Sequence, residues 1–291
     1  MKLSFKVRLG VIMLIILIIA LPAYIYGDVG PKPYVVINIS GLEGQTYYTT
    51  LLSPDKHLGP NFVYNAEYPE NARYREGDAE YPIFRKFVDY NCPEGFYFLQ
   101  NFSNSSESHA FSWSYFPPSE YKVLIYLPQG EHFIISSATY SNYAFATRYL
   151  ATVIDDDILL TKNYKVASEV LFLIARIVLT IFIEVAIAWL FKIRQKKLIW
   201  LIVIVNVITQ VTLNILLNLS NFYYGIVVAI TTLLLLEIVV FAIEALIYGL
   251  TFKRLSQGEI KGFKGVIYTL VANSASLLIG FALVFIIPGM F

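Results

Sequence analysis

The sequence is poor in cysteine and in charge. Its 291 residues contain one cysteine, so no intramolecular disulfide can form, and a cysteine-rich zinc, iron–sulfur or knottin-type scaffold is excluded. Only 15% of the residues are charged, whereas a typical soluble globular domain has about 25%. Hydrophobic residues make up 57% of the chain. A wholly soluble protein is therefore not expected.

Sequence signatures of several enzyme classes are also missing. The chain contains no GxSxG, HExxH, P-loop or GxGxxG motif. Its three histidines, at positions 57, 109 and 132, lie far apart and lack the spacing of metal ligands. The net charge of +1 gives no basic field that would attract nucleic acid. We predict no catalytic residue, no cofactor, no metal site and no nucleic-acid partner.

The first 27 residues have the features of a targeting segment. A basic stretch precedes an uncharged run from Leu9 to Tyr26, which Pro22 interrupts. This pattern fits a signal peptide, although no clean cleavage site of small residues is present. The run is also just long enough to span a bilayer as an uncleaved signal anchor. Both alternatives deliver the following segment across the membrane.

Residues 28–166 are polar, rich in aromatic residues and interrupted by turn-forming residues. Short alternating or β-branched runs recur between these turns, which predicts an extracytoplasmic antiparallel β-sandwich. In one run, Val123, Ile125 and Leu127 are expected to share a face. The predicted strands cover residues 34–39, 47–52, 96–99, 121–127, 133–135 and 149–154.

Two other parts of this segment are predicted to be irregular or short. Residues 53–81 are expected to form a long surface loop, followed by a short helix around residues 83–88. The acidic run of residues 155–157 lacks the spacing of a calcium loop, and it is expected to be a solvated stalk before the first membrane helix.

The C-terminal part, residues 167–291, contains four hydrophobic spans. They cover about residues 167–191, 198–219, 223–250 and 265–288, and each reaches the roughly 20 residues that a bilayer requires. The connectors are short, so consecutive helices must be antiparallel neighbours. The sequence therefore predicts an α-helical four-transmembrane bundle.

Basic residues concentrate in segments that share one side of the membrane if the spans alternate. The N-terminal stretch and the connectors 192–197 and 252–264 contain three, four and four basic residues, against one acid, Glu259. The positive-inside rule places these segments in the cytoplasm. Residues 28–166, with ten basic and sixteen acidic residues, and the C-terminus then lie outside. We predict a multi-pass protein of the plasma membrane.

Polar side chains inside the predicted spans are costly unless they find partners or serve a function. The amides of the second span recur every four residues and therefore follow one slowly winding face. We predict an intramembrane polar cluster with an Arg176–Glu237 ion pair at its centre. One arginine cannot balance three glutamates, so at least one glutamate is expected to hold a proton. The predicted cluster comprises Arg176, Glu184, Asn206, Gln210, Asn214, Glu237, Glu244 and Asn273.

Three interpretations of this polar cluster are open. Interhelical hydrogen bonds of roughly 1 kcal/mol or less each can hold a membrane bundle together. Alternatively, the carboxylates and amides form a site for an ion, a proton or a small solute. An intramembrane hydrolase is a third interpretation, and no motif supports it.

Several segments resemble an uncharacterised group of Gram-positive bacterial membrane proteins. They are GPKPYVVI at residues 30–37, GLEGQTYY at 41–48, PSEYKVLIYLP at 118–128 and the pattern NxxTQxxLN at 206–214, with Glu237 and Glu244. The resemblance implies an extracytoplasmic β domain on a C-terminal four-helix bundle, a cleaved signal before Asp28 and a Gram-positive envelope. It implies no mechanism, because no function is known for the group.

These features lead to two functional hypotheses. In the first, the chain is a non-enzymatic envelope protein whose outer domain binds a ligand or a partner protein, and the bundle is its anchor in the lipid bilayer. The cytoplasmic connectors are too short to form a domain, so any cytoplasmic output requires a membrane or envelope protein partner. In the second, the chain is a small ion- or proton-coupled carrier or channel component that uses the intramembrane carboxylates.

Overall fold

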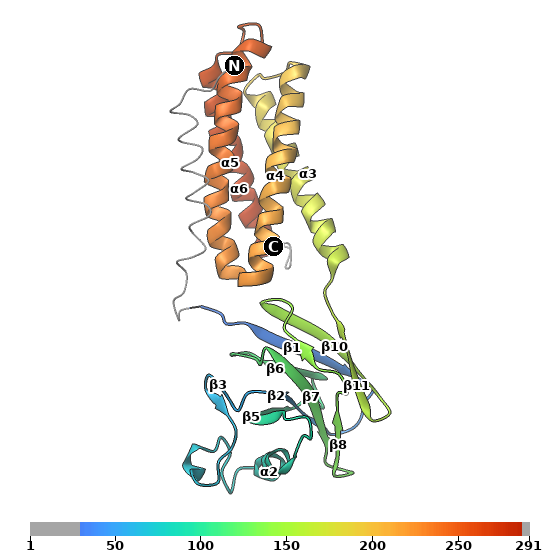
Figure 1. Ribbon diagram of the computed structural model, residues 1–291. Coiled ribbons are helices and arrows are strands. Elements are labelled where there is room, and N and C mark those ends of the chain that lie inside the picture. The colour runs from blue at the N-terminus through green and yellow to red at the C-terminus, as the bar shows by residue number, and fades with distance from the viewer. Residues whose placement is uncertain (1–29, 287–291) are drawn as a thin grey trace. The chain divides into compact units, whose positions relative to one another are not determined.

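The computed structural model describes residues 30–286 and divides them into two compact units (Figure 1). The β unit comprises residues 31–164, and the helical unit begins at Lys165. Strands therefore precede a group of long apolar helices, as the composition of the two parts of the chain predicts. The predicted signal peptide or signal anchor, residues 1–27, lies outside the described residues.

The first sheet of the β unit is mixed. Its strand order is β11-β10-β1-β6. Strands β1 and β10 are parallel from the pair Tyr34 and Ala146 to the pair Ser40 and Thr152, so the predicted antiparallel arrangement is wrong for this pair, although β1–β6 and β10–β11 are antiparallel. A parallel pair requires a long crossover, which residues 41–145 provide. The strands are β1 (Tyr34–Ser40), β6 (Ala110–Trp113), β10 (Ala146–Ile154) and β11 (Asp157–Lys162).

The second sheet is antiparallel and follows the order β5-β2-β7-β8, with β9 also paired to β7. Its strands are β2 (Tyr48–Ser53), β5 (Tyr97–Asn104), β7 (Glu120–Leu127), β8 (His132–Ile135) and β9 (Tyr140–Ser141). The segment that we expected to be a surface loop contains the hairpin β3 (His57–Leu58) and β4 (Asn61–Phe62) and the 3-10 turn Pro69–Asn71.

Both sheets contribute to one apolar core. Val35 and Ile37 of β1 enter it beside Val123 and Ile125 of β7, with Trp113 of β6 almost completely buried. Alternate residues of each strand point to the same side of the sheet, which is why the period-2 pattern of the sequence marks these positions.

The short helix α2 (Tyr81–Asp89) covers the opposite face of the second sheet. Phe84 and Phe87 of α2 pack among aromatic side chains of the sheet, and the rings of Phe87 and Phe98 lie 5.2 Å apart. Leu124 and Tyr126 belong to this second core, so β7 is buried on both faces. Strand β7 therefore reads as a nearly continuous apolar run.

Strand β11 replaces part of the stalk that the sequence led us to expect. Asp155 and Asp156 form the turn from β10 to β11, and Asp157 is the first residue of β11. Ile158 and Leu160 are buried in the shared core. The stalk prediction is wrong because these alternating apolar residues gain more by pairing with β10 than by exposure to water.

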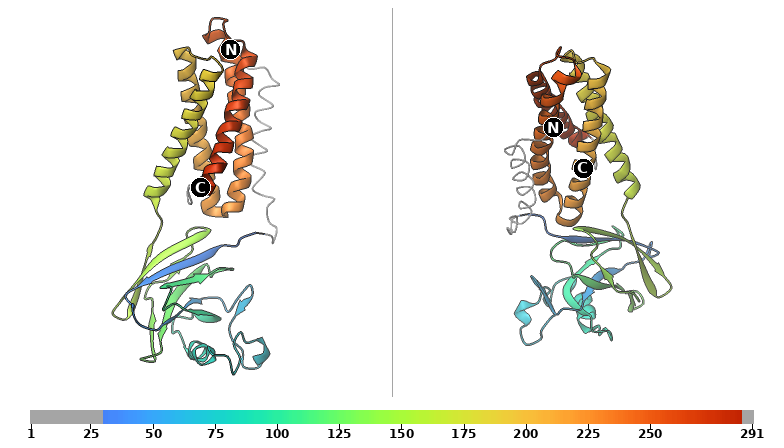
Figure 2. Two further views of the ribbon diagram at one scale, coloured as in Figure 1. Left: turned by 180° about the vertical axis from the view of Figure 1, so that it is seen from behind. Right: turned by 45° about the horizontal axis from the view of Figure 1, so that its top comes forward.

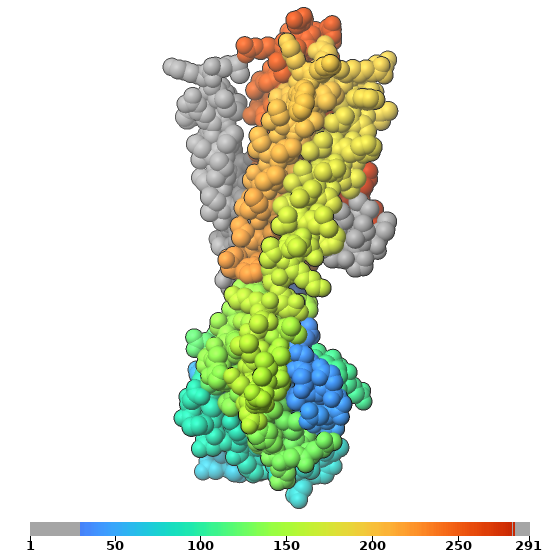
Figure 3. Space-filling view, turned by 90° about the vertical axis from the view of Figure 1, so that its right-hand side faces the viewer, coloured from blue at the N-terminus to red at the C-terminus, as the bar shows by residue number. Residues whose placement is uncertain are grey.

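Among the residues that the structure describes, the helical unit has four long helices that pack side by side (Figure 2). Each helix packs against the next, and α3 also packs against α6; Figure 3 shows α3 lying along α4. All four are long and apolar enough to span a membrane, so the chain has the features of a multi-pass membrane protein. They are α3 (Val166–Leu190), α4 (Lys196–Tyr224), α5 (Ile226–Leu255) and α6 (Gly262–Ile286).

Glycines allow α5 and α6 to approach closely. A Cβ atom at Gly262 of α6 would collide with the backbone carbonyl of Gly249 of α5. One at Gly265 would lie 3.0 Å from the carbonyl oxygen of Tyr248. Small residues at membrane-helix interfaces commonly permit such close packing.

We predict that Gly262→Ala separates α5 from α6 and lowers the free energy of unfolding by about 1–3 kcal/mol, the usual cost of overpacking. The measurement is unfolding of the full chain in mixed detergent micelles. Gly280→Ala is the matched control, because a Cβ there meets no described atom within 4 Å. Equal stability of the two variants would contradict the predicted contact.

Candidate functional site

Glu184 is a completely buried carboxylate in the helical unit. It lies on α3, and its Oε2 atom accepts a hydrogen bond of 2.5 Å from Nδ2 of Asn206 on α4. The hydroxyl group of Tyr268 on α6 lies 3.2 Å from the same oxygen and 3.1 Å from the backbone oxygen of Glu184. Three helices therefore meet at this one carboxylate.

Glu244 of α5 is equally buried and has its own set of donors. The hydroxyl group of Thr209 on α4 donates to Oε1 at 2.9 Å, and Nδ2 of Asn273 on α6 donates to Oε2 at 2.7 Å. Asn206 and Thr209 are three residues apart on α4 and so lie on the same face of that helix. One face of α4 thus supplies a donor to each glutamate.

We call these two glutamates and the five residues around their carboxylates the polar core. One face of α4 reaches both of its carboxylates, through Asn206 and Thr209. The Tyr248 hydroxyl lies 3.4 Å from Nδ2 of Asn206. The ring of Tyr248 stacks on the ring of Phe252, and the two ring centroids are 5.1 Å apart. All four helices contribute to the core. Its members are Glu184, Asn206, Thr209, Glu244, Tyr248, Tyr268 and Asn273.

Four of the eight side chains predicted to form the cluster belong to this polar core, and the other four do not share its hydrogen bonds. Asn214 donates to the backbone oxygen of Gln210 within α4. Glu237 is half-buried on α5, and no hydrogen bond to its carboxylate forms within residues 30–286. Arg176 interacts electrostatically with Glu169 of its own helix.

The predicted Arg176–Glu237 ion pair does not form between these two described residues. The prediction rested on similar depth in the membrane, but depth does not fix the direction in which a side chain leaves its helix. Tyr268 was not predicted at all. Tyr268 precedes Asn273 by five residues, so it is not part of a pattern of polar residues at intervals of three or four.

The β unit contains a groove with a volume of about 340 Å³. The turns after β1, β7 and β10 surround it, so residues from both sheets line it. Leu42 and Ile134 are buried at its apolar base, and Gln45, Gln129 and His132 are exposed around it. This volume falls within the range of about 300–1,000 Å³ that is typical of small-molecule sites. No local pattern in the sequence indicates this groove, because three turns that are far apart in the chain form it.

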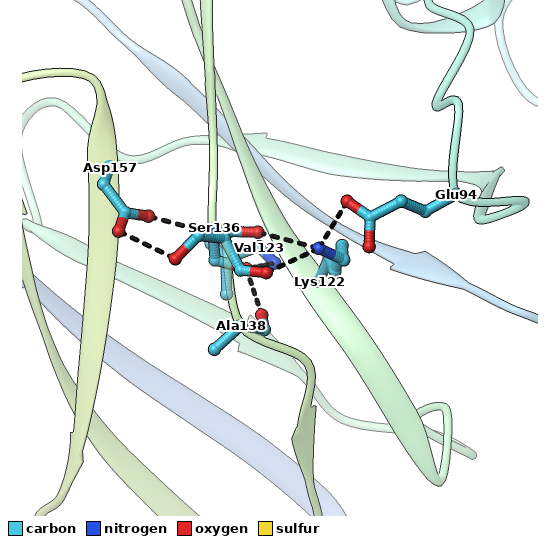
Figure 4. Close-up of polar contacts among 7 residues, drawn as sticks. Glu94, Lys122, Val123, Ser136, Ala138 and Asp157 are labelled. Atoms are coloured by element: carbon cyan, nitrogen blue, oxygen red, sulfur yellow. Dashed lines mark hydrogen bonds and ion pairs between the residues drawn. The ribbon is translucent and has the colours of Figure 1, made fainter.

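Lys122 is a buried cation in the middle of β7, and it too escaped the sequence reasoning (Figure 4). Its Nζ atom bonds to Glu94 at 2.8 Å and to the backbone oxygens of Ser136 and Ser137 at 3.2 and 2.8 Å. Asp157 accepts two hydrogen bonds from Ser137, which lower the pKa of its carboxyl group. Lys122 thus links β7 to the segment that follows β8, and Ser137 of that segment bonds to β11.

Comparison with known proteins adds no further constraint on function. No family model, curated protein or solved structure matches the chain. Within residues 30–286, no group of three or more histidine, cysteine, aspartate or glutamate side chains is arranged to hold a metal ion. The polar core and the groove of the β unit are the two candidate functional sites.

We predict that Asn206→Leu destabilises the helical unit by about 1–3 kcal/mol, because Glu184 loses a buried donor. Unfolding of the full chain in mixed micelles measures the change. Asn218→Leu, the same substitution on the same helix, is the control, since Asn218 is half-exposed and outside the polar core. An equal decrease in the free energy of unfolding in both variants would show that the Asn206–Glu184 hydrogen bond does not stabilise the helical unit.

Proposed function

We propose that the chain is a multi-pass membrane protein whose β unit lies outside the cytoplasm and binds a small ligand, or a segment of a partner protein, in its groove. The helical unit anchors it. The observation that carries this proposal is the groove of about 340 Å³, which has an apolar base and polar surroundings. Binding sites of this kind usually combine an apolar surface with a few polar groups that orient the ligand.

The outward faces of the helices support the membrane placement. Large apolar side chains such as Phe182 and Leu278 are exposed there, and a lipid bilayer would cover them. Trp189 and Trp200 are exposed near the 191–195 connector, and Tyr223 is exposed near the end of α4. Tryptophan and tyrosine are enriched at both membrane–water interfaces.

The distribution of charge supports the orientation. Basic residues dominate the two connectors 191–195 and 256–261 and the helix ends beside them. A hydrogen bond from Gln195 to Glu259 joins these connectors, so they lie at the same end of the bundle. The positive-inside rule assigns that end to the cytoplasm and the acidic β unit to the other side.

The shared core of the two sheets supports the interpretation of the β unit as a sandwich with a binding site at one end. Turns at the end of a sandwich are held by a rigid core while their own side chains stay accessible. His132 and Asp156 form an exposed pair at 2.9 Å beside the groove. The groove is lined by the amides of Gln45 and Gln129, the imidazole of His132 and the carboxylate of Asp155 beside apolar side chains, which suits a ligand with an apolar body and hydrogen-bond donors.

Ion- or proton-coupled transport is the second candidate function. One observation favours it: two carboxylates are buried among four apolar helices. Transport also requires a path from the polar core to both sides of the membrane. Ligand binding by an anchored β unit requires no such path, so we propose it as the main function and transport as the second candidate.

We predict that a fluorophore on Gln45→Cys reports saturable binding of at least one member of a panel of N-acetyl amino acids and N-acetyl amino sugars. Native Cys92 is buried and adds little background. Adding Gln129→Trp, which puts bulk into the groove, should weaken that binding at least tenfold.

Glu67→Cys, on an exposed loop that does not line the groove, is the control position. Its fluorophore should not respond to the same compounds. Absence of saturable binding at Gln45→Cys, or the same response at both positions, would refute the groove as the binding site.

A further inference from the structure

Three buried acceptor atoms of the polar core lack a donor. Within residues 30–286, Oε1 of Glu184 and the Oδ1 atoms of Asn206 and Asn273 are buried and have no hydrogen-bond partner. Each of these three atoms is an acceptor. A buried polar atom without a partner is costly, so the core lacks donors for atoms that cannot reach water.

The polar core also has more negative than positive charge. Within the described residues, no lysine, arginine or histidine forms an ion pair with Glu184 or Glu244. An uncompensated charge in an apolar interior costs several kcal/mol, and two adjacent carboxylates increase that cost. A bound species that carries positive charge and donates a hydrogen bond would compensate the negative charge and give an unpartnered acceptor a donor.

The titratable groups around this site come from three helices. Glu184 belongs to α3, and Arg176 lies about two turns before it on the same helix. Glu237, Glu244 and Tyr248 belong to α5, and Tyr268 belongs to α6. The face of α4 contributes only the amide of Asn206 and the hydroxyl of Thr209.

The arrangement of the amides favours a proton over a metal ion. Asn206 and Asn273 direct their N–H groups, and not their oxygen atoms, toward the carboxylates. Hard cations such as Ca²⁺ require a shell of six to eight oxygen ligands. Donors that occupy the carboxylate oxygens leave no such shell, whereas a proton needs one carboxylate oxygen and one acceptor.

We propose that Glu184 and Glu244 form a proton-binding site, in which the folded bundle holds at least one carboxyl group in its protonated form at neutral pH. The bound proton removes one of the two charges and supplies an O–H donor to a core that lacks donors. The site is in the helical unit and does not depend on binding in the groove of the β unit. Release of this proton would leave the second negative charge uncompensated and remove the O–H donor, and it would thereby weaken the packing of all four helices.

Infrared spectroscopy of the full chain in lipid nanodiscs tests the proposal directly. At pH 7, exposed glutamates are ionised, since their pKa is about 4.3. The wild-type chain should nevertheless show the C=O stretch of a protonated carboxylic acid, shifted in D₂O. The double variant Glu184→Gln/Glu244→Gln should lack the band and still fold, because glutamine imitates the neutral acid. Glu259→Gln, in the exposed connector, should keep it.

The pH dependence of stability gives a second measurement on the same proteins. A proton that is bound in the folded bundle and released on unfolding makes the folding equilibrium constant fall as pH rises, by up to tenfold per pH unit for each proton. Wild type and Glu259→Gln should show this slope between about pH 5 and pH 7, where an unfolded glutamate with a pKa of about 4.3 has released its proton and the folded bundle still holds it, and the double variant should be flatter.

Three results would overturn the proposal. The first is the absence of a protonated carboxyl band in the wild-type chain at pH 7. The second is persistence of that band in the double variant, which would place the proton elsewhere. The third is a wild-type chain that lacks the band and is more stable in NaCl than in choline chloride at equal ionic strength. That result would assign the site to a sodium ion.

Discussion

The buried hydrogen bonds that Glu184 and Glu244 accept are the interactions on which the helical unit depends. Apolar side chains give four membrane helices little preference for one packing over another, because lipid tails are equally apolar. A buried carboxylate is satisfied only where its donors meet it. The bonds from Asn206 and Thr209 on α4 and from Asn273 on α6 therefore fix both the rotation and the depth of these helices around α3 and α5.

Close packing and polar satisfaction act together in this unit. The approach of Gly262 to Gly249 brings α6 against α5, beside Tyr248. Tyr248 and Tyr268 then lie within 5.9 Å of each other, measured between ring centroids. Small residues thus permit the approach, and the hydroxyl and amide groups determine which approach is stable.

A different constraint organises the β unit, where water drives apolar side chains inward. Strand β7 is buried on both faces, between the shared core of the two sheets and the aromatic cluster under α2. Lys122 breaks this apolar strand, and its bonds to Glu94, Ser136 and Ser137 satisfy the charge. A rigid centre of this kind can hold the turns around the groove in fixed positions.

Local patterns in the sequence predicted the elements better than their partners. Runs of apolar residues located the four helices, and alternation located strands such as β1 and β7. The parallel pairing of β1 with β10 was not predictable, because nothing local links Tyr34 to Ala146. Spacing indicated a polar face on α4, but only the packing shows that Asn206 meets Glu184 and that Arg176 does not meet Glu237.

We propose that the β unit and the basic connectors lie on opposite sides of a membrane. Cysteines introduced one at a time at Glu67, in the β unit, and at Lys261, in a connector, can be labelled with a membrane-impermeant maleimide in protoplasts, while the native Cys92 is buried. Both positions are exposed. We predict that Glu67→Cys reacts in intact protoplasts and that Lys261→Cys reacts only after permeabilisation. Reaction of both before permeabilisation, or the reverse order, would contradict the claim.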